Sequence, residues 1–129
     1  MTEELTPDYL SLEDLLEIAL GVIGDLQVRD IGLLASAAAR PQSSAFGASA
    51  YPRLVDKAAA LMHSLARNHP LVDGNKRLAW AATRSFLILN DSDIEYDVDE
   101  AESLVLGVAS GQIDVPQIAE WLEQRLVND

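Results

Sequence analysis

A stretch near the middle of the chain most constrains the fold, because its apolar side chains point in nearly every direction around a helix. Residues 75–90 contain nine apolar residues and neither proline nor glycine. A helix that is apolar all round is buried in the interior of a protein. The stretch therefore predicts a central helix around which the other elements pack. Its apolar residues are Leu78, Ala79, Trp80, Ala81, Ala82, Phe86, Leu87, Ile88 and Leu89.

Apolar residues recur at helical spacing in most of the remaining chain. Further helices are predicted at residues 12–23, 31–40, 53–68, 99–110 and 114–127. Polar residues suited to capping stand at the start of four of them: Ser11, Asp30, Asp99 and Asp114. Only residues 94–98 alternate in the way a strand does. We therefore expect an all-α fold, a six-helix bundle around a buried central helix, with at most a small β-hairpin.

One long loop remains between these helices, at residues 41–52. It is bounded by Pro41 and Pro52 and is rich in small residues, with Phe46 and Tyr51 as its only large apolar side chains. A loop of this length inside a compact domain is usually functional or mobile.

The length and composition limit the class of protein. A chain of 129 residues fits a single domain over residues 1–129. It has no cysteine, which excludes disulfides, thiolate metal sites and a cysteine nucleophile. No stretch approaches the roughly 18 apolar residues of a membrane span, and the first residues are acidic rather than signal-like. We expect a cytoplasmic protein without membrane contact.

Charge is distributed unevenly along the sequence. The formal net charge is −12, yet residues 31–90 hold seven of the nine Lys and Arg residues and two of the 21 acidic residues. The net charge argues against direct nucleic-acid binding, which depends on phosphate neutralisation by Lys and Arg. A positive centre in an acidic chain suits a small anionic ligand. Buried helices that simply carry fewer acids would give the same division, so charge alone leaves both explanations open.

A candidate phosphate site lies between the two longest predicted helices, in residues 68–77. This segment leads into a helix N-terminus, where backbone N–H groups without helical partners bind anions. Gly74 lets the backbone approach a phosphate or adopt a positive φ. Lys76 and Arg77 add two cations, and Asn75 can cap the helix or donate its amide to a phosphate oxygen.

Two further residues of the same segment complete a candidate active site. His69 is the side chain best suited to accept a proton at neutral pH and so to act as a general base. Asp73 can hold Mg²⁺ beside a phosphate, because magnesium takes one or two protein carboxylates and completes its shell with phosphate and water. Each residue alone also fits an ordinary turn or cap. Their combination within nine residues favours a site.

The run His-Pro-Leu-Val-Asp-Gly-Asn-Lys-Arg at residues 69–77 resembles the signature of the Fic fold, His-x-Phe-x-(Asp/Glu)-Gly-Asn-x-Arg-x-x-Arg, and in particular its death-on-curing (Doc) branch. Lys76 stands where Fic nucleotidyltransferases have glycine, and Trp80 stands where they have the second arginine. Gly74 matches the Fic pattern rather than the alanine of Doc. Leu71 replaces phenylalanine and keeps a packing role. The chain is similar to Doc toxins along nearly its whole length.

This resemblance implies the toxin of a toxin–antitoxin pair, an enzyme that transfers the γ-phosphoryl group of ATP to a hydroxyl of a target protein. In Doc the target is a threonine of elongation factor Tu, so that translation stops. His69 would activate the hydroxyl and Asp73 would hold Mg²⁺. The phosphates would bind Gly74, Asn75, Lys76 and Arg77.

Two alternatives remain open beside phosphoryl transfer. Lys76 and Trp80 favour it, whereas Gly74 keeps AMP transfer, the reaction of Fic proteins proper, as an alternative. The second alternative is a non-catalytic module that binds an antitoxin. The intact residues His69, Asp73, Asn75 and Arg77 argue against that interpretation.

The resemblance also implies a role for the loop at residues 41–52. In Fic-fold proteins a flap before the motif clamps the target chain by strand-like pairing, which assigns target binding to Phe46 and Gly47. Many Fic proteins block their own site with a Ser/Thr-x-x-x-Glu helix, but no Ser or Thr here is followed by Glu four residues later. We therefore expect a Phd-like antitoxin that inhibits in trans, bound near Arg53, Lys57 and the flap.

Four other residues receive structural predictions. His63 is expected to face solvent, because it lies opposite the apolar stripe of its helix. Arg84 is expected to pair with the acidic terminal segments. Trp80 and Trp121 are expected in the core.

Overall fold

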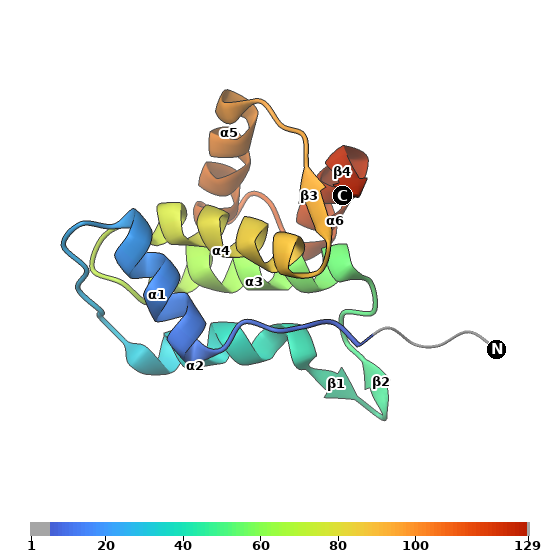
Figure 1. Cartoon of the computed structure of the whole chain (residues 1–129), viewed down its shortest axis with the longest axis horizontal. Coiled ribbons are helices and arrows are strands. Elements are labelled where there is room, and N and C mark those ends of the chain that lie inside the picture. Colours follow the sequence, from blue (N-terminus) through green and yellow to red (C-terminus); the bar gives the residue numbers. More distant parts are fainter. Residues whose placement is uncertain (1–5, 129) are drawn as a thin grey trace.

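The computed structural model describes residues 6–128, and within them it shows a bundle of six α-helices with two small antiparallel strand pairs (Figure 1). The helices are α1 (Leu12–Val22), α2 (Ile31–Ala39), α3 (Leu54–Asn68), α4 (Asn75–Leu89), α5 (Val98–Ala109) and α6 (Val115–Arg125). A 3₁₀ turn, η1, spans Arg40–Gln42. The strand pairs are β1 (Ser44–Ala45) with β2 (Ala48–Ser49), and β3 (Ser92–Ile94) with β4 (Leu126–Asn128). The predicted all-α fold is confirmed.

Helix α3 lies at the centre of the bundle. It packs against η1, α2, α4, α5 and α6, and its buried alanines at residues 58–60 let neighbouring elements approach closely. The prediction that residues 75–90 form the central buried helix is therefore wrong in part. Helix α4 packs against α1, α3, α5 and β3, but Ile88 and Leu89 at its end are nearly half exposed.

Polar side chains cap the helices largely as predicted. The caps of α1, α2 and α6 are Ser11, Asp30 and Asp114. The cap of α5 is Asp97 rather than the predicted Asp99. The Asp97 carboxylate accepts hydrogen bonds from the first two N–H groups after Val98, at 2.9 and 3.2 Å, so the helix begins earlier than expected.

The C-terminal strand shifts two predicted boundaries. The strand expected at residues 94–98 lies two residues earlier, as β3, because it pairs with β4 in a register that sets Ile94 opposite Leu126. The last helix consequently ends at Arg125 rather than near Val127. A pairing between segments so far apart in the chain leaves no local pattern in the sequence.

The loop at residues 41–52 contains a hairpin, β1–β2, that projects from the bundle (Figure 1). Its two turn residues are Phe46, with φ 54°, and Gly47, with φ 79°. Positive φ at both central residues is typical of the type I′ turn that joins two-residue hairpins. Glycine adopts this backbone without strain, whereas a bulky residue such as Phe46 does so rarely. The Phe46 side chain is nevertheless fully exposed at the tip.

Polar residues fix the base of this hairpin to the bundle. Lys57 of α3 is only 6% exposed, and its Nζ lies 3.2 Å from Ser49 Oγ and 3.4 Å from the Pro41 carbonyl. Arg40 of η1 donates from Nε to the Tyr51 hydroxyl at 2.9 Å. Hydrogen bonds from Lys57 and Arg40 therefore fix both ends of the hairpin loop to the bundle.

Arg40 also reaches α3, where it determines the environment of His63. Its Nη1 donates to His63 Nδ1 at 2.9 Å and to Ser64 Oγ at 3.0 Å, while His63 Nε2 lies 3.4 Å from Asp114 Oδ1. Burial and the Arg40 charge lower the pKa of His63. The prediction that His63 faces solvent is wrong, and Lys57 is likewise too buried to belong to an antitoxin-binding surface. These buried polar residues explain why the sequence pattern did not identify α3 as the central helix.

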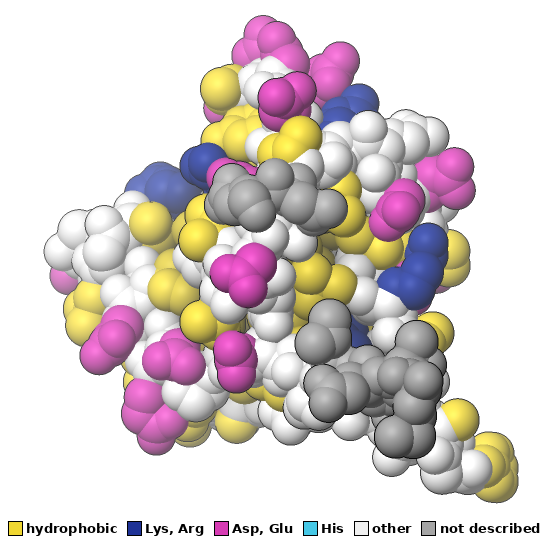
Figure 2. Space-filling model, turned by 45° about the vertical axis from the view of Figure 1, so that its right-hand side comes forward, with side chains coloured by type: hydrophobic (Ala, Val, Ile, Leu, Met, Phe, Trp, Pro, Cys, Tyr) yellow, Lys and Arg dark blue, Asp and Glu magenta, His cyan; other side chains and the backbone are white. Residues whose placement is uncertain are grey.

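The exposed surface shows the excess of acidic residues that the composition indicates. In Figure 2, acidic side chains are scattered over the visible face with few Lys and Arg between them, in agreement with the net charge of −12. None of the described helices has both the length and the apolar character needed to cross a membrane.

Candidate active site

The loop that joins α3 to α4 is bounded by two residues with left-handed backbone. His69 follows α3 with φ 51° and ψ 60°, and Gly74 precedes α4 with φ 88° and ψ 11°. Between them Leu71 is 1% exposed, which confirms its packing role, whereas His69 and Asp73 are exposed. The loop is thus fixed in the core at its middle and leaves both candidate reactive side chains accessible.

The side chain of Asn75 clamps this loop to the start of α4. Its Oδ1 accepts the Leu71 N–H at 2.8 Å, and its Nδ2 donates to the Leu71 carbonyl at 2.9 Å. Both residues are buried, so neither bond competes freely with water. The structure thus gives Asn75 a positioning task. Its predicted contact with phosphate stays a prediction, for which one N–H of the amide remains.

A second segment braces the loop from the side opposite α4. The N–H groups of Arg29 and Asp30 both donate to the Pro70 carbonyl, at 2.8 and 3.0 Å. The Arg29 guanidinium donates to the carbonyls of His69 at 2.7 Å and Asn68 at 2.8 Å. Arg29 therefore holds the backbone that carries the candidate base.

Arg29 was missed by reasoning from the sequence. Its signal was charge, since it is the one basic residue in residues 1–30, a range with eight acids. The carbonyls it binds lie at the end of α3, where unpaired C=O groups carry the negative end of the helix dipole. A lone cation in an acidic segment could therefore have been interpreted as the partner of a helix C-terminus.

Helix α1 packs against the start of α4 and favours glycine there. A Cβ on Gly74 would lie 2.5 Å from Ile23 Cδ1, so both the left-handed backbone and the limited space disfavour a side chain. Arg77 lies beside the same helix end, with Nη1 3.3 Å from the Val22 carbonyl. The α1 C-terminus thus orients one of the two candidate phosphate-binding cations.

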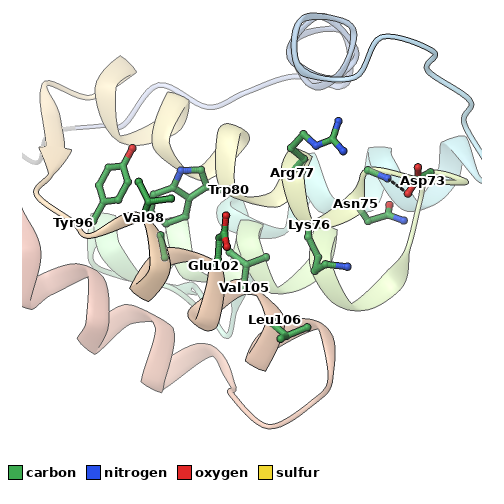
Figure 3. A pocket seen from close by; sticks show the side chains of 12 residues that line it. Asp73, Asn75, Lys76, Arg77, Trp80, Tyr96, Val98, Glu102, Val105 and Leu106 are labelled. Carbon is green, nitrogen blue, oxygen red and sulfur yellow. Dashed lines mark hydrogen bonds between the residues drawn. The ribbon is translucent and has the colours of Figure 1, made fainter.

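A pocket of about 510 Å³ opens between α4 and α5 (Figure 3). It brings together five of the predicted site residues: Asp73, Gly74, Asn75, Lys76 and Arg77. Its remaining lining residues are Trp80, Tyr96, Val98, Ala101, Glu102, Val105 and Leu106. The predicted site residues His69, Phe46 and Gly47 are not among its lining. His69 lies on the loop that leads into the pocket, and the hairpin tip is a separate projection (Figure 1).

The start of α4 is suited to an anion. The N–H groups of residues 75–77 precede the first hydrogen bond of the helix, which runs from the Leu78 N–H to the Gly74 carbonyl at 2.9 Å. The exposed side chains of Lys76 and Arg77 add positive charge on the same turn. The helix dipole and the charges of the two side chains therefore both attract an anion to this turn.

Asp73 is the residue of this loop that could hold a metal, and that role stays a prediction. One carboxylate oxygen accepts the N–H of Gly74 at 2.9 Å, and the side chain is exposed. Among the described residues no group of three or more His, Asp and Glu side chains could hold a metal ion by itself. Magnesium fits this arrangement, because it is often bound through one carboxylate, with phosphate oxygens and water as its other ligands.

Aromatic residues form the far end of the pocket. The Trp80 ring meets Tyr96 edge-on with centroids 4.8 Å apart and Trp121 at 6.1 Å. Both tryptophans are half-buried and pack against the core rather than inside it, which corrects the prediction.

Arg84 makes the predicted ion pair. It binds both Asp93 carboxylate oxygens at 3.1 Å, and this hydrogen bond lowers the pKa of the Asp93 carboxyl. It also stacks on Tyr96, 5.5 Å from the ring centroid.

Comparisons with known proteins match the part of the chain that contains this site. The sequence profile of the Fic/DOC family matches residues 9–87, a span that includes the hairpin, Arg29 and the loop before α4. A protein named Toxin Doc, from Mycolicibacterium smegmatis (strain ATCC 700084 / mc(2)155), is 55% identical over 120 residues. The match covers 89% of this chain and 91% of that protein.

The role of Gly74 can be tested against another glycine of the same region. We expect Gly74→Ala to destabilise the protein by about 1–3 kcal/mol, because the left-handed backbone and the contact with Ile23 both oppose a Cβ. Gly21 lies inside α1, and beyond its own helix backbone no atom lies within 4 Å of the position that a Cβ would take. Gly21→Ala should therefore be neutral or stabilise the protein by about 0.5–1 kcal/mol. Urea unfolding measures both. Equal free energies of unfolding for the two variants would contradict the account. In an Ile23→Ala background, the cost of adding Gly74→Ala should be smaller than in the wild type, because the clashing side chain is gone.

Proposed function

The chain belongs to the Fic/DOC family, and we propose that it is a Doc-like toxin that uses ATP and Mg²⁺ to phosphorylate a hydroxyl group of a target protein. The observation that carries the proposal is the pocket at the start of α4, where Asp73, Lys76 and Arg77 accompany the unpaired N–H groups of a helix N-terminus. The similarity to Toxin Doc over most of both chains supports a role in a toxin–antitoxin pair.

Each residue has a distinct task in this proposal. ATP supplies the phosphoryl group when bound, and Mg²⁺ neutralises part of its charge. Asp73 holds the metal, and the backbone of Gly74 and Asn75 together with Lys76 and Arg77 binds phosphate oxygens. His69 takes the proton from the attacking hydroxyl, and its exposure leaves it open to a protein substrate.

Trp80 supports phosphoryl transfer over AMP transfer. The position belongs to an arginine in Fic nucleotidyltransferases, but here an aromatic ring lines the pocket one turn beyond Lys76. The described lining thus offers Lys76 and Arg77 as its cations, which suits one end of a phosphate chain better than its whole length. Gly74 is the feature that favours AMP transfer as the second candidate.

The proposed partners follow from the hairpin and from the family. The target chain, proposed to be a translation elongation factor such as elongation factor Tu, pairs with the flap, where Phe46 offers a fully exposed aromatic ring. Inhibition is assigned to a Phd-like antitoxin whose disordered segment folds on binding. Arg53 remains exposed beside the flap for such a contact, although it already pairs with Asp56 at 2.9 Å.

Label transfer tests the function and the base together. The protein is incubated with cell lysate and ATP labelled at the γ- or the α-phosphate. We expect γ-label on a protein in the wild type and a loss of about 10²–10⁴-fold in His69→Asn, because general base catalysis contributes that much. Asparagine tolerates the left-handed backbone at residue 69, so the variant should unfold at the wild-type urea concentration.

Two results of this experiment would contradict the proposal. Transfer of α-label would replace it with AMP transfer, and the absence of any label on protein would favour the non-catalytic module. Near wild-type transfer by the folded His69→Asn variant would exclude His69 as the base.

The flap is tested by a substitution that separates stability from function. Phe46→Asn places the residue type most suited to a type I′ turn before Gly47, so we expect the free energy of unfolding to stay equal or to rise by up to about 1 kcal/mol. Transfer of label to protein should fall at least tenfold, while calorimetric binding of ATP stays unchanged. Unchanged transfer would exclude Phe46 from target binding.

A further inference from the structure

The pocket extends beyond its phosphate end along one face of α5. Five α5 residues line it, at the helical spacing 98, 101, 102, 105 and 106. Four are apolar: Val98, Ala101, Val105 and Leu106. Val98 and Leu106 are 63% and 58% exposed, so the described chain leaves much of this face uncovered. The volume of about 510 Å³ lies in the range of pockets for small organic ligands.

One carboxylate interrupts this apolar wall. Glu102 is exposed, and within the part of the chain that the structure describes it makes no hydrogen bond or ion pair. Figure 3 shows its side chain reaching from α5 towards α4, between Trp80 and Lys76. A carboxylate accepts hydrogen bonds but donates none, and it repels phosphate. Its position in an anion-binding pocket therefore suits a ligand that also carries hydrogen-bond donors.

The spacing along α4 indicates which part of a ligand meets Glu102. Trp80 follows Gly74 by six residues, and six residues of α-helix span about 9 Å. When the phosphates of a ligand bind the first turn of α4, the part of the ligand between those phosphates and Trp80 lies beside Glu102 (Figure 3). In a nucleoside triphosphate this group is the ribose, and carboxylates accept hydrogen bonds from ribose hydroxyls in dinucleotide-binding proteins.

We propose that Glu102 accepts hydrogen bonds from the ribose hydroxyls of the nucleotide, an inference that rests on the proposed use of ATP. The base then lies against Trp80, Tyr96 and Val98, where the aromatic rings offer the stacking that binds bases of any sequence. Glu102 is on this account a specificity-determining residue. Its negative charge disfavours the binding of bare polyphosphates, and its hydrogen bonds with the ribose favour the binding of nucleotides.

Binding measurements test the inference without turnover. Calorimetry is carried out on the full chain with His69→Asn, in Mg²⁺, with ATP, 2′,3′-dideoxy-ATP and tripolyphosphate as probes. We expect ATP to bind about 10–100-fold more tightly than dideoxy-ATP, the ratio expected for hydrogen bonds to a charged group. Adding Glu102→Ala should weaken the binding of ATP by that factor and change the affinity for dideoxy-ATP by no more than about threefold. The same substitution should strengthen the binding of tripolyphosphate.

Asp99→Ala is the matched control, because it removes one negative charge from the same helix at an exposed residue outside the pocket lining. It should preserve the preference for ATP. If Glu102→Ala and the control keep the same ratio of ATP to dideoxy-ATP affinity, the inference is overturned while the proposed use of ATP stands. If tripolyphosphate binds and ATP binds no more tightly, the nucleoside part of the pocket is excluded. If none of the three probes binds, the proposed function and the inference both fall.

Discussion

The candidate site depends on one buried amide. Asn75 binds both the N–H and the carbonyl of Leu71, as a neighbouring strand would, and thereby fixes the loop to the first turn of α4. Removing that side chain would leave two backbone groups of a buried residue without partners, at a cost of about 1–3 kcal/mol for each. Because His69 lies two residues before Leu71 and Gly74 three residues after it, this single contact sets the candidate base relative to the anion site. Arg29 completes the arrangement by holding the His69 carbonyl.

Helix α3 joins this site to the flap. Its C-terminus carries His69, and its buried side carries Lys57 and His63, which hold the base of the hairpin directly or through Arg40. Polar residues in the interior of a helix bundle are unfavourable unless they are hydrogen-bonded. Lys57 binds the hairpin loop itself and His63 binds Arg40 beneath it, so the polar residues of α3 position the segment in which we place target binding.

The sequence was sufficient for the features that depend on local patterns. The all-α class, the caps at Ser11, Asp30 and Asp114, and the turn at Gly74 all follow from spacing and residue type, and the structure confirms them. The sequence was insufficient where a contact with a distant segment determines the burial of a residue or the position of an element. Lys57 and His63 were predicted at the surface because polar residues usually lie there. The position of β3 was predicted wrongly because it depends on pairing with β4, more than 30 residues later in the chain. The pocket itself depends on α5, which the motif does not include.

The most direct test of the account is a crystal structure of the His69→Asn variant with Mg²⁺ and adenylyl imidodiphosphate, an ATP analogue that resists transfer. The account predicts phosphate oxygens on the N–H groups of residues 75–77, the metal on Asp73, and both hydrogen bonds between Asn75 and Leu71 intact, since the loop is already in its working position. A nucleotide bound elsewhere, or an Asn75 amide that has left Leu71 to bind phosphate, would contradict it.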